Sequence, residues 1–262
     1  MISIIVPALN EENNIERCLK SLKNQYFTDA EYEIIVVDGN SKDKTVKIAT
    51  NYADKVVYQK SGGIGGARRD GADASVGNIL VFTDADTVHD RNWLSTIYKN
   101  MGTYDISTGP ILFQEGDLKS DFLELWRKSY KLFQLFNFYW LIGSNMAIRG
   151  DVYNKIDGHK NISILEDFDL SVQLFREGDV LSTFDKNQRV YTSARRIDNL
   201  LIYFLIYAYG HYHYHLTKNY DNLLNYPRFD EMDLKSFLKI PDRFDREKIN
   251  ALYYNLRSAM TK

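Results

Sequence analysis

The chain has almost no cysteine and no long uninterrupted apolar run. Cys18 is the only cysteine among 262 residues, which excludes an internal disulfide framework and favours a reducing compartment. The first residues carry no basic segment, so a secretory signal is not expected. Residues 199–217 hold no Asp, Glu, Lys or Arg, but the strongly apolar part runs only from Leu200 to about Tyr209. That length is too short to span a bilayer, so we expect a packed or interfacial helix in a cytoplasmic protein, either soluble or peripheral on the cytoplasmic face of the membrane.

Charge is nearly balanced overall but unevenly distributed. The chain has 33 Lys+Arg against 35 Asp+Glu, with 44% hydrophobic and 26% charged residues, which excludes a disordered or fibrous protein. Residues 1–185 hold 20 basic and 27 acidic side chains, whereas residues 186–262 hold 13 and 8. A basic C-terminal part next to an acidic body suggests an anionic surface or ligand, and a membrane surface is the partner expected there. No nucleic-acid partner is expected.

Short apolar runs alternate with helical patterns through the first half of the chain. The predicted strands cover residues 2–6, 33–37, 55–58 and 78–82, and the predicted helices cover 11–24, about 43–52 and about 65–75. This alternation predicts an α/β fold with a mostly parallel central sheet and helices on both faces. Ligands of such sheets bind at the carboxyl ends of the strands.

Polar residues follow three of these strands. Asn10 and Asp43 are explained equally well as helix caps or as ligand contacts. Asp84 and Asp86 leave a fully apolar strand two residues apart, so the strand period points both side chains the same way. Two carboxylates that close repel unless a cation intervenes, and oxygen-only ligands suit Mg²⁺ or Mn²⁺. We therefore predict a divalent-metal site here.

A glycine-rich turn over residues 62–71 places Arg68 and Arg69 at a helix start. It lacks the Gly-Lys-Ser/Thr ending of a phosphate-binding loop and does not fit Gly-x-Gly-x-x-Gly. Its guanidinium groups could bind a diphosphate, although a surface turn with solvated arginines explains the pattern as well.

Three carboxylates, Glu166, Asp167 and Asp169, crowd the start of a helix predicted to open at Ile162 and to run to about Arg176. Interaction with the helix dipole is a sufficient structural reason for one or two of them. A carboxylate placed beside a metal–diphosphate site could instead act as a general base.

The order of these motifs resembles family 2 glycosyltransferases of the GT-A fold. The resemblance covers about residues 1–196 and rests on five segments: 5–12 (IVPALNEE), 36–45 (VVDGNSKDKT), 66–71 (GARRDG), 82–86 (FTDAD) and 166–167 (ED). It implies an inverting enzyme that uses a nucleoside-diphosphate sugar. We divide the chain accordingly into a transferase domain, 1–196, and a helical C-terminal extension, 197–262, which packs on the domain or faces a membrane.

The resemblance also implies roles for matching residues. A nucleotide pocket is implied for Pro7, Asn10, Glu11, Asp38 (the base), Arg68 (the diphosphate) and Asp84 (the ribose). The resemblance implies that Asp86 and Asp84 bind the metal. It implies that Asp167 and Glu166 form the catalytic pair. Gly39 departs from the family's second aspartate, and Arg69 adds positive charge near the phosphates. Arg195 is a weaker match to a basic residue close to the donor.

Aromatic residues are dense over 118–142, a region that in the family builds the acceptor side. Core packing explains most of these side chains, and sugar stacking or a polyprenyl carrier could explain the others. His211 and His215 stand one helical turn apart and could share or complete a metal shell, although packed or surface histidines are commoner.

We therefore predict an inverting, Mg²⁺- or Mn²⁺-dependent transfer from a UDP- or GDP-sugar to a hydroxyl of a glycan or polyprenyl-linked acceptor. A sugar-phosphate nucleotidyltransferase is one alternative, but residues 7–10 (PALN) lack its glycine-rich basic signature. A non-catalytic nucleotide- or carbohydrate-binding module is the other, and the presence of Asp84, Asp86 and Asp167 speaks against it.

Overall fold

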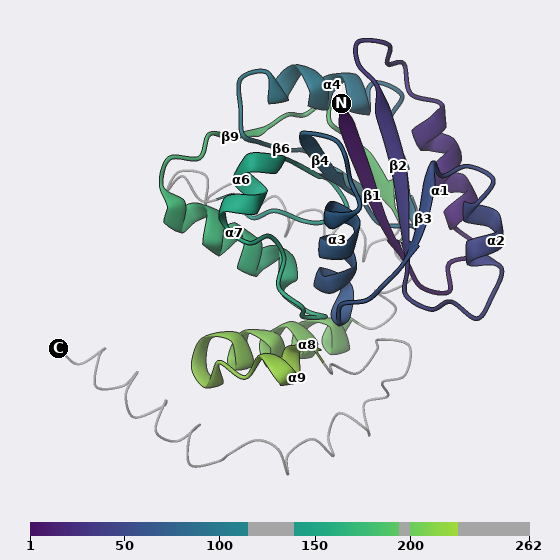
Figure 1. Cartoon of the computed structure of the whole chain (residues 1–262). Helices are drawn as coiled ribbons and strands as arrows, with labels where there is room; N and C mark the ends of the chain where they lie inside the picture. The colour runs from purple at the N-terminus through teal and green to yellow at the C-terminus, as the bar shows by residue number, and fades with distance from the viewer. Residues whose placement is uncertain (115–138, 194–199, 225–262) are drawn as a thin grey trace.

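The computed structural model describes residues 1–114, 139–193 and 200–224 (Figure 1). The aromatic segment up to residue 138, Arg195 and the tail beyond residue 224 lie outside the described residues.

A seven-stranded sheet forms the centre of the molecule, in the order β3-β2-β1-β4-β8-β6-β9. β8 runs antiparallel to both of its neighbours, and the other pairs are parallel, which confirms the predicted mostly parallel sheet. The strands are β1 (Ile2–Ala8), β2 (Tyr32–Asp38), β3 (Lys55–Tyr58), β4 (Ile79–Phe82), β6 (Ile106–Thr108), β8 (Met146–Arg149) and β9 (Ser182–Phe184).

Helices cover both faces of this sheet (Figure 1). They are α1 (Ile15–Lys23), α2 (Thr45–Ala49), α3 (Gly63–Asp73), α4 (Trp93–Met101), α6 (Gly150–Lys155) and α7 (Glu166–Glu177). The strand period of two sends Ile4 to the face packed by α1 and α4, and Ile5 to the face packed by α3 and α7. Both layers are apolar and fully buried, so the burial of β1 on two faces accounts for its unbroken apolar run.

Two helices begin later than the sequence predicts. α1 starts at Ile15 rather than at residue 11, because the backbone N–H groups of Glu11 and Glu12 bind the side chains of Thr45, at the start of α2, and of Asp43, in the loop before it. α7 starts at Glu166 rather than at Ile162, because Leu165 has a positive φ of 62° and the preceding loop hydrogen-bonds to other segments.

A second, three-stranded sheet is absent from the sequence-based prediction. It contains β5 (Thr87–His89), β10 (Val190–Thr192) and β7 (Ile111–Phe113) in that spatial order. β10 pairs antiparallel with β5 and parallel with β7. This pairing brings Thr192 beside Thr87 and so next to the turn that carries Asp84 and Asp86.

The described part of the C-terminal extension is helical, as predicted. It consists of α8 (Leu200–Tyr212), a π-helical turn (His213–Thr217) and α9 (Tyr220–Leu224). Ile206 and Leu223 pack on the loop before α7, in one apolar cluster with Ile162, Ile164 and Leu165. In Figure 1 these helices lie at the ends of α3 and α7. Over the described ranges, no helix combines the length and the apolarity required to cross a bilayer.

Candidate active site

The carboxyl ends of β1, β2 and β4 lie side by side at one edge of the central sheet. β1 pairs with β2 in a register that sets Ala8 against Asp38, and β4 follows on the other side of β1. The loops after these strands therefore meet, and they carry most of the residues that the sequence selects.

Asp38 and Asn10 connect the loops after β2 and β1. Asp38 is 1% exposed, and its carboxylate accepts the N–H groups of Asn40 and Ser41. Asn10 has a positive φ of 53°, receives the N–H of Lys42 on its side-chain oxygen and donates its own N–H to Ser41. Asn10 therefore joins two loops and does not cap α1, whose N-cap residue is Asn14.

Pro7 and Glu11 complete this part of the site. Pro7 is buried within β1 opposite Val37. Glu11 is 6% exposed, and its carboxylate accepts a hydrogen bond from the side-chain amide of Asn14. The structure thus gathers the four residues assigned to the base and nucleotide at the β1–β2 edge.

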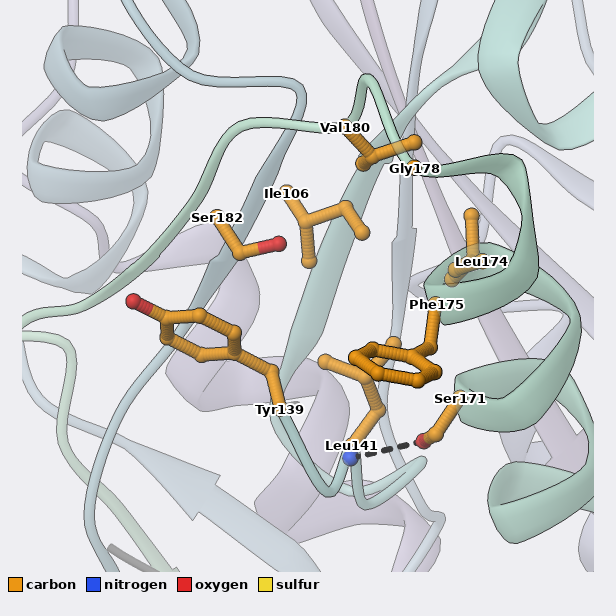
Figure 2. Close-up of a pocket in the computed structure, with 9 residues that line it drawn as sticks. All are labelled: Ile106, Tyr139, Leu141, Ser171, Leu174, Phe175, Gly178, Val180 and Ser182. Atoms are coloured by element: carbon orange, nitrogen blue, oxygen red, sulfur yellow. Dashed lines mark hydrogen bonds between the residues drawn. The ribbon is translucent and has the colours of Figure 1, made fainter. Parts of the chain in front are cut away.

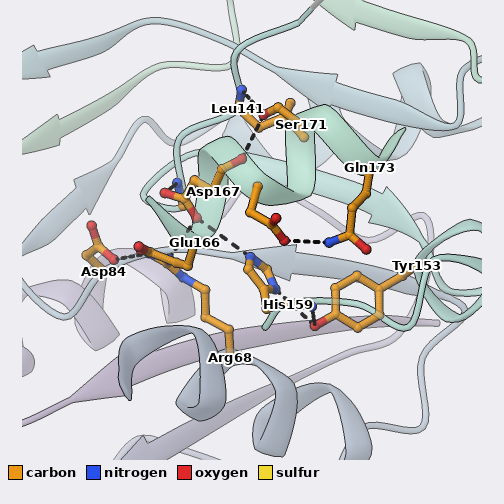
Figure 3. Close-up of polar contacts among 11 residues, drawn as sticks. Arg68, Asp84, Leu141, Tyr153, His159, Glu166, Asp167, Ser171 and Gln173 are labelled. Atoms are coloured by element: carbon orange, nitrogen blue, oxygen red, sulfur yellow. Dashed lines mark hydrogen bonds and ion pairs between the residues drawn. The ribbon is translucent and has the colours of Figure 1, made fainter. Parts of the chain in front are cut away.

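Arg68 on α3 lies at the centre of an ion-pair cluster (Figure 3). Its side chain is 2% exposed, so the surface-turn explanation does not hold for this arginine. Its guanidinium contacts carboxylates from two other segments: Nη1 lies 2.5 Å from Glu166 Oε1 and 2.7 Å from Asp167 Oδ1, and Nη2 lies 3.0 Å from Asp84 Oδ1.

Two glycines make room for this arginine. A Cβ on Gly71 would overlap Ile5, so α3 can pack closely on β1 only with glycine there. A Cβ on Gly143 would overlap the guanidinium of Arg68. These close approaches hold Arg68 under the loop that contains Gly143.

The cluster holds more negative than positive charge. Burial alone would lower the pKa of Arg68, but the three carboxylates outweigh burial and raise it, so the guanidinium stays charged. Burial raises the pKa of Glu166, and the neighbouring charge of Asp167 adds to this. Burial also raises the pKa of Asp167, although Arg68 and the N–H of Gly143 oppose the rise. One guanidinium does not neutralise three carboxylates, so the cluster favours an added cation or a proton.

Asp167 is held in place on both carboxylate oxygens. Oδ2 accepts the backbone N–H of Gly143 at 2.6 Å, and Oδ1 accepts Arg68. Ser171, one turn later, donates to the backbone carbonyl of Asp167 and accepts the N–H of Leu141. The Asp167 side chain as a whole keeps an exposed fraction of 18%.

Asp84 and Asp86 do not lie on one strand face. β4 ends at Phe82, and both aspartates belong to the turn that follows, so the strand-period argument does not hold for their orientation. Asp84 pairs with Arg68, whereas Asp86 Oδ1 accepts a hydrogen bond of 3.4 Å from Thr192 on β10. Asp86 is 6% exposed. Within the described segments, no three His, Cys, Asp or Glu side chains are arranged to hold a metal by themselves.

The remaining predicted residues lie away from Arg68 or are not described. Arg69 ion-pairs with Asp157 at 2.6 Å, so the structure does not bring it to the carboxylate cluster. His211 and His215 stack on each other with ring centroids 5.5 Å apart, and both rings meet Phe168 edge-to-face. Phe168 follows Asp167 directly, so the histidine pair packs against the start of α7.

Three functional candidates are missing from the sequence-based prediction. Gly143 supplies an N–H to Asp167, and His159 places its Nε2 3.6 Å from the same carboxylate. Tyr214 in the π-helical turn donates to Asp169, which is fully buried and also binds Lys160. No local pattern marks these residues, because each acts through a contact with α7 that only the folded chain creates.

A separate apolar hollow lies on the other side of the Leu141–Ser171 contact (Figure 2). Its volume is about 230 Å³. It is lined by Ile106, Tyr139, Leu141, Ser171, Leu174, Phe175, Gly178, Val180 and Ser182, none of which is Asp, Glu, Lys, Arg or His. This composition does not suit a diphosphate or a metal.

The central sheet and the acidic side chains at its strand ends define an α/β protein with a candidate ligand site at the carboxyl ends of β1, β2 and β4. The family model "Glycosyl transferase family 2" matches residues 3–157, more than half of the chain, and the chain belongs to this family. This confirms the resemblance to family 2 glycosyltransferases that the motifs predict.

Two curated relatives support this assignment. Glycosyltransferase AglE of Haloferax volcanii is 33% identical over 99 residues, covering 36% of this chain and 33% of the relative. GalNAc(5)-diNAcBac-PP-undecaprenol beta-1,3-glucosyltransferase of Campylobacter jejuni is 32% identical over 130 residues, covering 46% and 41%. Each match spans less than half of the relative's length.

Solved structures confirm the GT-A fold. Staphylococcus aureus TarS in complex with UDP-GlcNAc has a TM-score of 0.57 at 19% identity, covering 73% of this chain and 58% of TarS. The mannosyltransferase PcManGT of Pyrobaculum calidifontis in complex with GDP-Man and Mn²⁺ has a TM-score of 0.59 at 20% identity, covering 75% and 59%.

Proposed function

We propose that the protein transfers a sugar, with inversion, from a nucleoside-diphosphate sugar to an acceptor hydroxyl, with Asp167 as the general base. The observation that carries this proposal is the setting of Asp167. Its carboxylate is fixed through both oxygens by Arg68 and Gly143, while its side chain keeps an exposed fraction of 18%. Burial raises its pKa, which moves the base toward the working pH range.

The donor nucleotide is proposed to bind at the β1–β2 edge. Pro7, Asn10, Glu11 and Asp38 lie there, and Asp38 keeps acceptor capacity beyond the two N–H groups of its own turn. Solved relatives of the same fold carry UDP-GlcNAc or GDP-Man, so both UDP and GDP donors are candidates.

A divalent cation, Mg²⁺ or Mn²⁺, is proposed to bind at Asp86 with Asp84 nearby. The residues fit this ion, because a buried carboxylate at a strand end supplies a hard oxygen ligand and the surrounding cluster has excess negative charge. No protein cage is required, since Mg²⁺ commonly takes one or two carboxylates together with substrate phosphates and water. A bound cation would act as a Lewis acid that stabilises the departing diphosphate. The PcManGT structure, which contains Mn²⁺, supports this choice.

The proposed reaction is a single displacement. The acceptor hydroxyl attacks the anomeric carbon on the face opposite the diphosphate, the bond from that carbon to the phosphate oxygen breaks, and Asp167 takes the hydroxyl proton. Arg68 supplies a positive charge beside Asp84 and Asp167 that can attract the diphosphate, and Glu166 holds the guanidinium in position.

The acceptor is proposed to be a glycan or a polyprenyl-linked sugar, and the protein to lie in the cytoplasm, in part at the membrane surface. The Campylobacter relative is named for an undecaprenol-linked acceptor. The aromatic, uncharged segment of α8 suits a lipid boundary. Flotation of the protein with liposomes of neutral and of anionic lipid tests the membrane part, and absence of binding to both would refute it.

A thermal-shift panel of UDP-, GDP- and dTDP-sugars, with and without Mn²⁺, tests the donor. Donors that stabilise the wild type are then assayed for release of nucleoside diphosphate. We expect Asp167→Asn to bind the donor but to lose turnover, and Asp86→Ala to lose the Mn²⁺-dependent stabilisation. Asp151→Asn, at an exposed carboxylate far from the cluster, is the control and keeps both.

Normal turnover by Asp167→Asn would remove this residue as the base. Failure of every UDP and GDP compound to bind would refute the transferase proposal as a whole. Pyrophosphate release from a sugar phosphate and a nucleoside triphosphate would favour the nucleotidyltransferase alternative instead.

A further inference from the structure

His159 is a fully buried histidine beside the proposed base. It lies in the loop between α6 and α7, its ring meets Phe82 edge-to-face at 4.9 Å, and its exposed fraction is 0%. Nδ1 is 2.9 Å from the hydroxyl of Tyr153, and Nε2 lies 3.6 Å from Asp167 Oδ1 (Figure 3). At that distance Nε2 has no hydrogen-bond partner among the described residues.

The Tyr153 hydroxyl determines which ring nitrogen carries the proton. The backbone N–H of His159 donates to the Tyr153 oxygen at 3.1 Å, so this oxygen already accepts one hydrogen bond. Tyr153 is 3% exposed, and its own proton finds an acceptor at Nδ1. Nδ1 is then unprotonated, and a neutral ring must carry its proton on Nε2, pointing at Asp167. The opposite tautomer would leave the tyrosine proton without this acceptor and set a lone pair against a carboxylate.

The ring is also neutral. The ionisable groups that face it are Arg68 and Arg69 from α3, Tyr153 from α6, and Glu166, Asp167 and Asp169 from α7. Burial lowers the pKa of His159 to about 3, and the charge of Arg68 lowers it further, against the opposing effect of Glu166 and Asp169. The imidazole therefore remains uncharged at any working pH.

We propose that His159 is a positioning residue for Asp167: its Nε2–H, fixed by Tyr153, orients the carboxylate through Oδ1 without adding charge. The inference rests on the proposed role of Asp167 as base. A positively charged imidazole in this place would depress the basicity of Asp167. A neutral N–H restrains the carboxylate and leaves it able to take a proton.

The first test needs no substrate. The chain has 5 histidines, so ¹⁵N-imidazole NMR of the full-length protein can assign His159 by its loss in His159→Gln. We expect the neutral Nε2–H form between pH 6 and 8, with a change in the Nε2 signal in Asp167→Asn. A protonated Nδ1, a cationic ring, or a signal unaffected by Asp167→Asn would overturn the proposal.

The second test is kinetic. Its substrate is whichever of UDP-glucose, UDP-GlcNAc and GDP-mannose the wild type turns over. His159→Phe keeps a buried ring and removes the N–H, and we expect kcat to fall about tenfold, with KM for the donor within about twofold. Loss of the His159 N–H raises the pKa of Asp167, so the acidic limb of the pH–rate profile moves to higher pH. Tyr153→Phe should give a smaller fall, and His159→Gln, which restores an N–H, should recover part of kcat.

A merely structural role predicts the opposite order, in which Phe is tolerated and Gln is harmful. Ile156→Ala removes packing from the same apolar cluster without removing a polar group, and it should lower the melting temperature without moving the acidic limb. If Asp167→Asn abolishes turnover while His159→Phe does not change it, the positioning role is wrong and the proposed function stands. If Asp167→Asn retains turnover, Asp167 is not the base, and the positioning role that rests on it is overturned as well.

Discussion

Replacing Arg68 by methionine tests the electrostatic description of the site. The substitution keeps an unbranched buried side chain and removes the guanidinium, which makes contacts of 2.5, 2.7 and 3.0 Å with three carboxylates. Removing one partner of a buried ion pair typically costs about 3–5 kcal/mol, because the other charge stays buried without compensation. We therefore expect Arg68→Met to lose about 3–5 kcal/mol of unfolding free energy at pH 8.

The loss should depend on pH in a defined direction. The pKa values of Glu166 and Asp167 are already raised by burial, and without Arg68 both rise further. A carboxyl whose folded-state pKa is raised stabilises the fold below its unfolded pKa, and this contribution is lost as the pH rises through the folded pKa. The destabilisation should therefore be largest at pH 8 and should shrink by about half toward pH 5, as the cluster takes up a proton.

Urea denaturation of wild type and variant at pH 5, 6, 7 and 8 provides the measurement. Arg69→Met is the matched control on the same helix, because the ion-pair partner of Arg69 among the described residues is Asp157, whose side chain is 94% exposed. Such a surface pair is worth about 0–1 kcal/mol, with little pH dependence above pH 5. Equal costs for the two variants, or a cost for Arg68→Met that does not change with pH, would refute the reasoning.

Two further predictions concern the supports of α7. Gly143→Ala would place a Cβ against the guanidinium of Arg68, and we expect it to cost about 1–3 kcal/mol of unfolding free energy and to abolish turnover. Gly102→Ala serves as the control in the same melting and activity assays, because the atom nearest to its Cβ is the Lys99 carbonyl oxygen at 3.3 Å. Tyr214→Phe removes a hydrogen bond to the fully buried Asp169 and should lower the unfolding free energy by about 1.5–3 kcal/mol, as measured by urea denaturation. A loss no larger than that of an exposed tyrosine substitution would contradict this role.

The residues that the sequence identified are those whose role depends on local pattern. An apolar run that ends at Asp38 or just before Asp84 marks a strand end, and parallel pairing then brings the ends together without further information. The environment of Arg68 could not be predicted, because its partner Glu166 is 98 residues away and the pattern GGARRDG is equally consistent with an exposed turn. The three-residue strands β5, β7 and β10 are too short to show a period.

The phase of α7 resolves the roles of its three acidic residues, which the sequence alone leaves undecided. Successive residues of a helix are about 100° apart, so neighbouring side chains cannot all face one partner. Glu166 and Asp167 straddle the direction of Arg68 and both reach it, whereas Asp169 points to Lys160 and Tyr214. The first two carboxylates therefore belong to the cluster around Arg68, and the third anchors α7 to the C-terminal helices. Because the π-helical turn with Tyr214 packs against the same helix end that presents Asp167, α8 and α9 help to hold the proposed base in place.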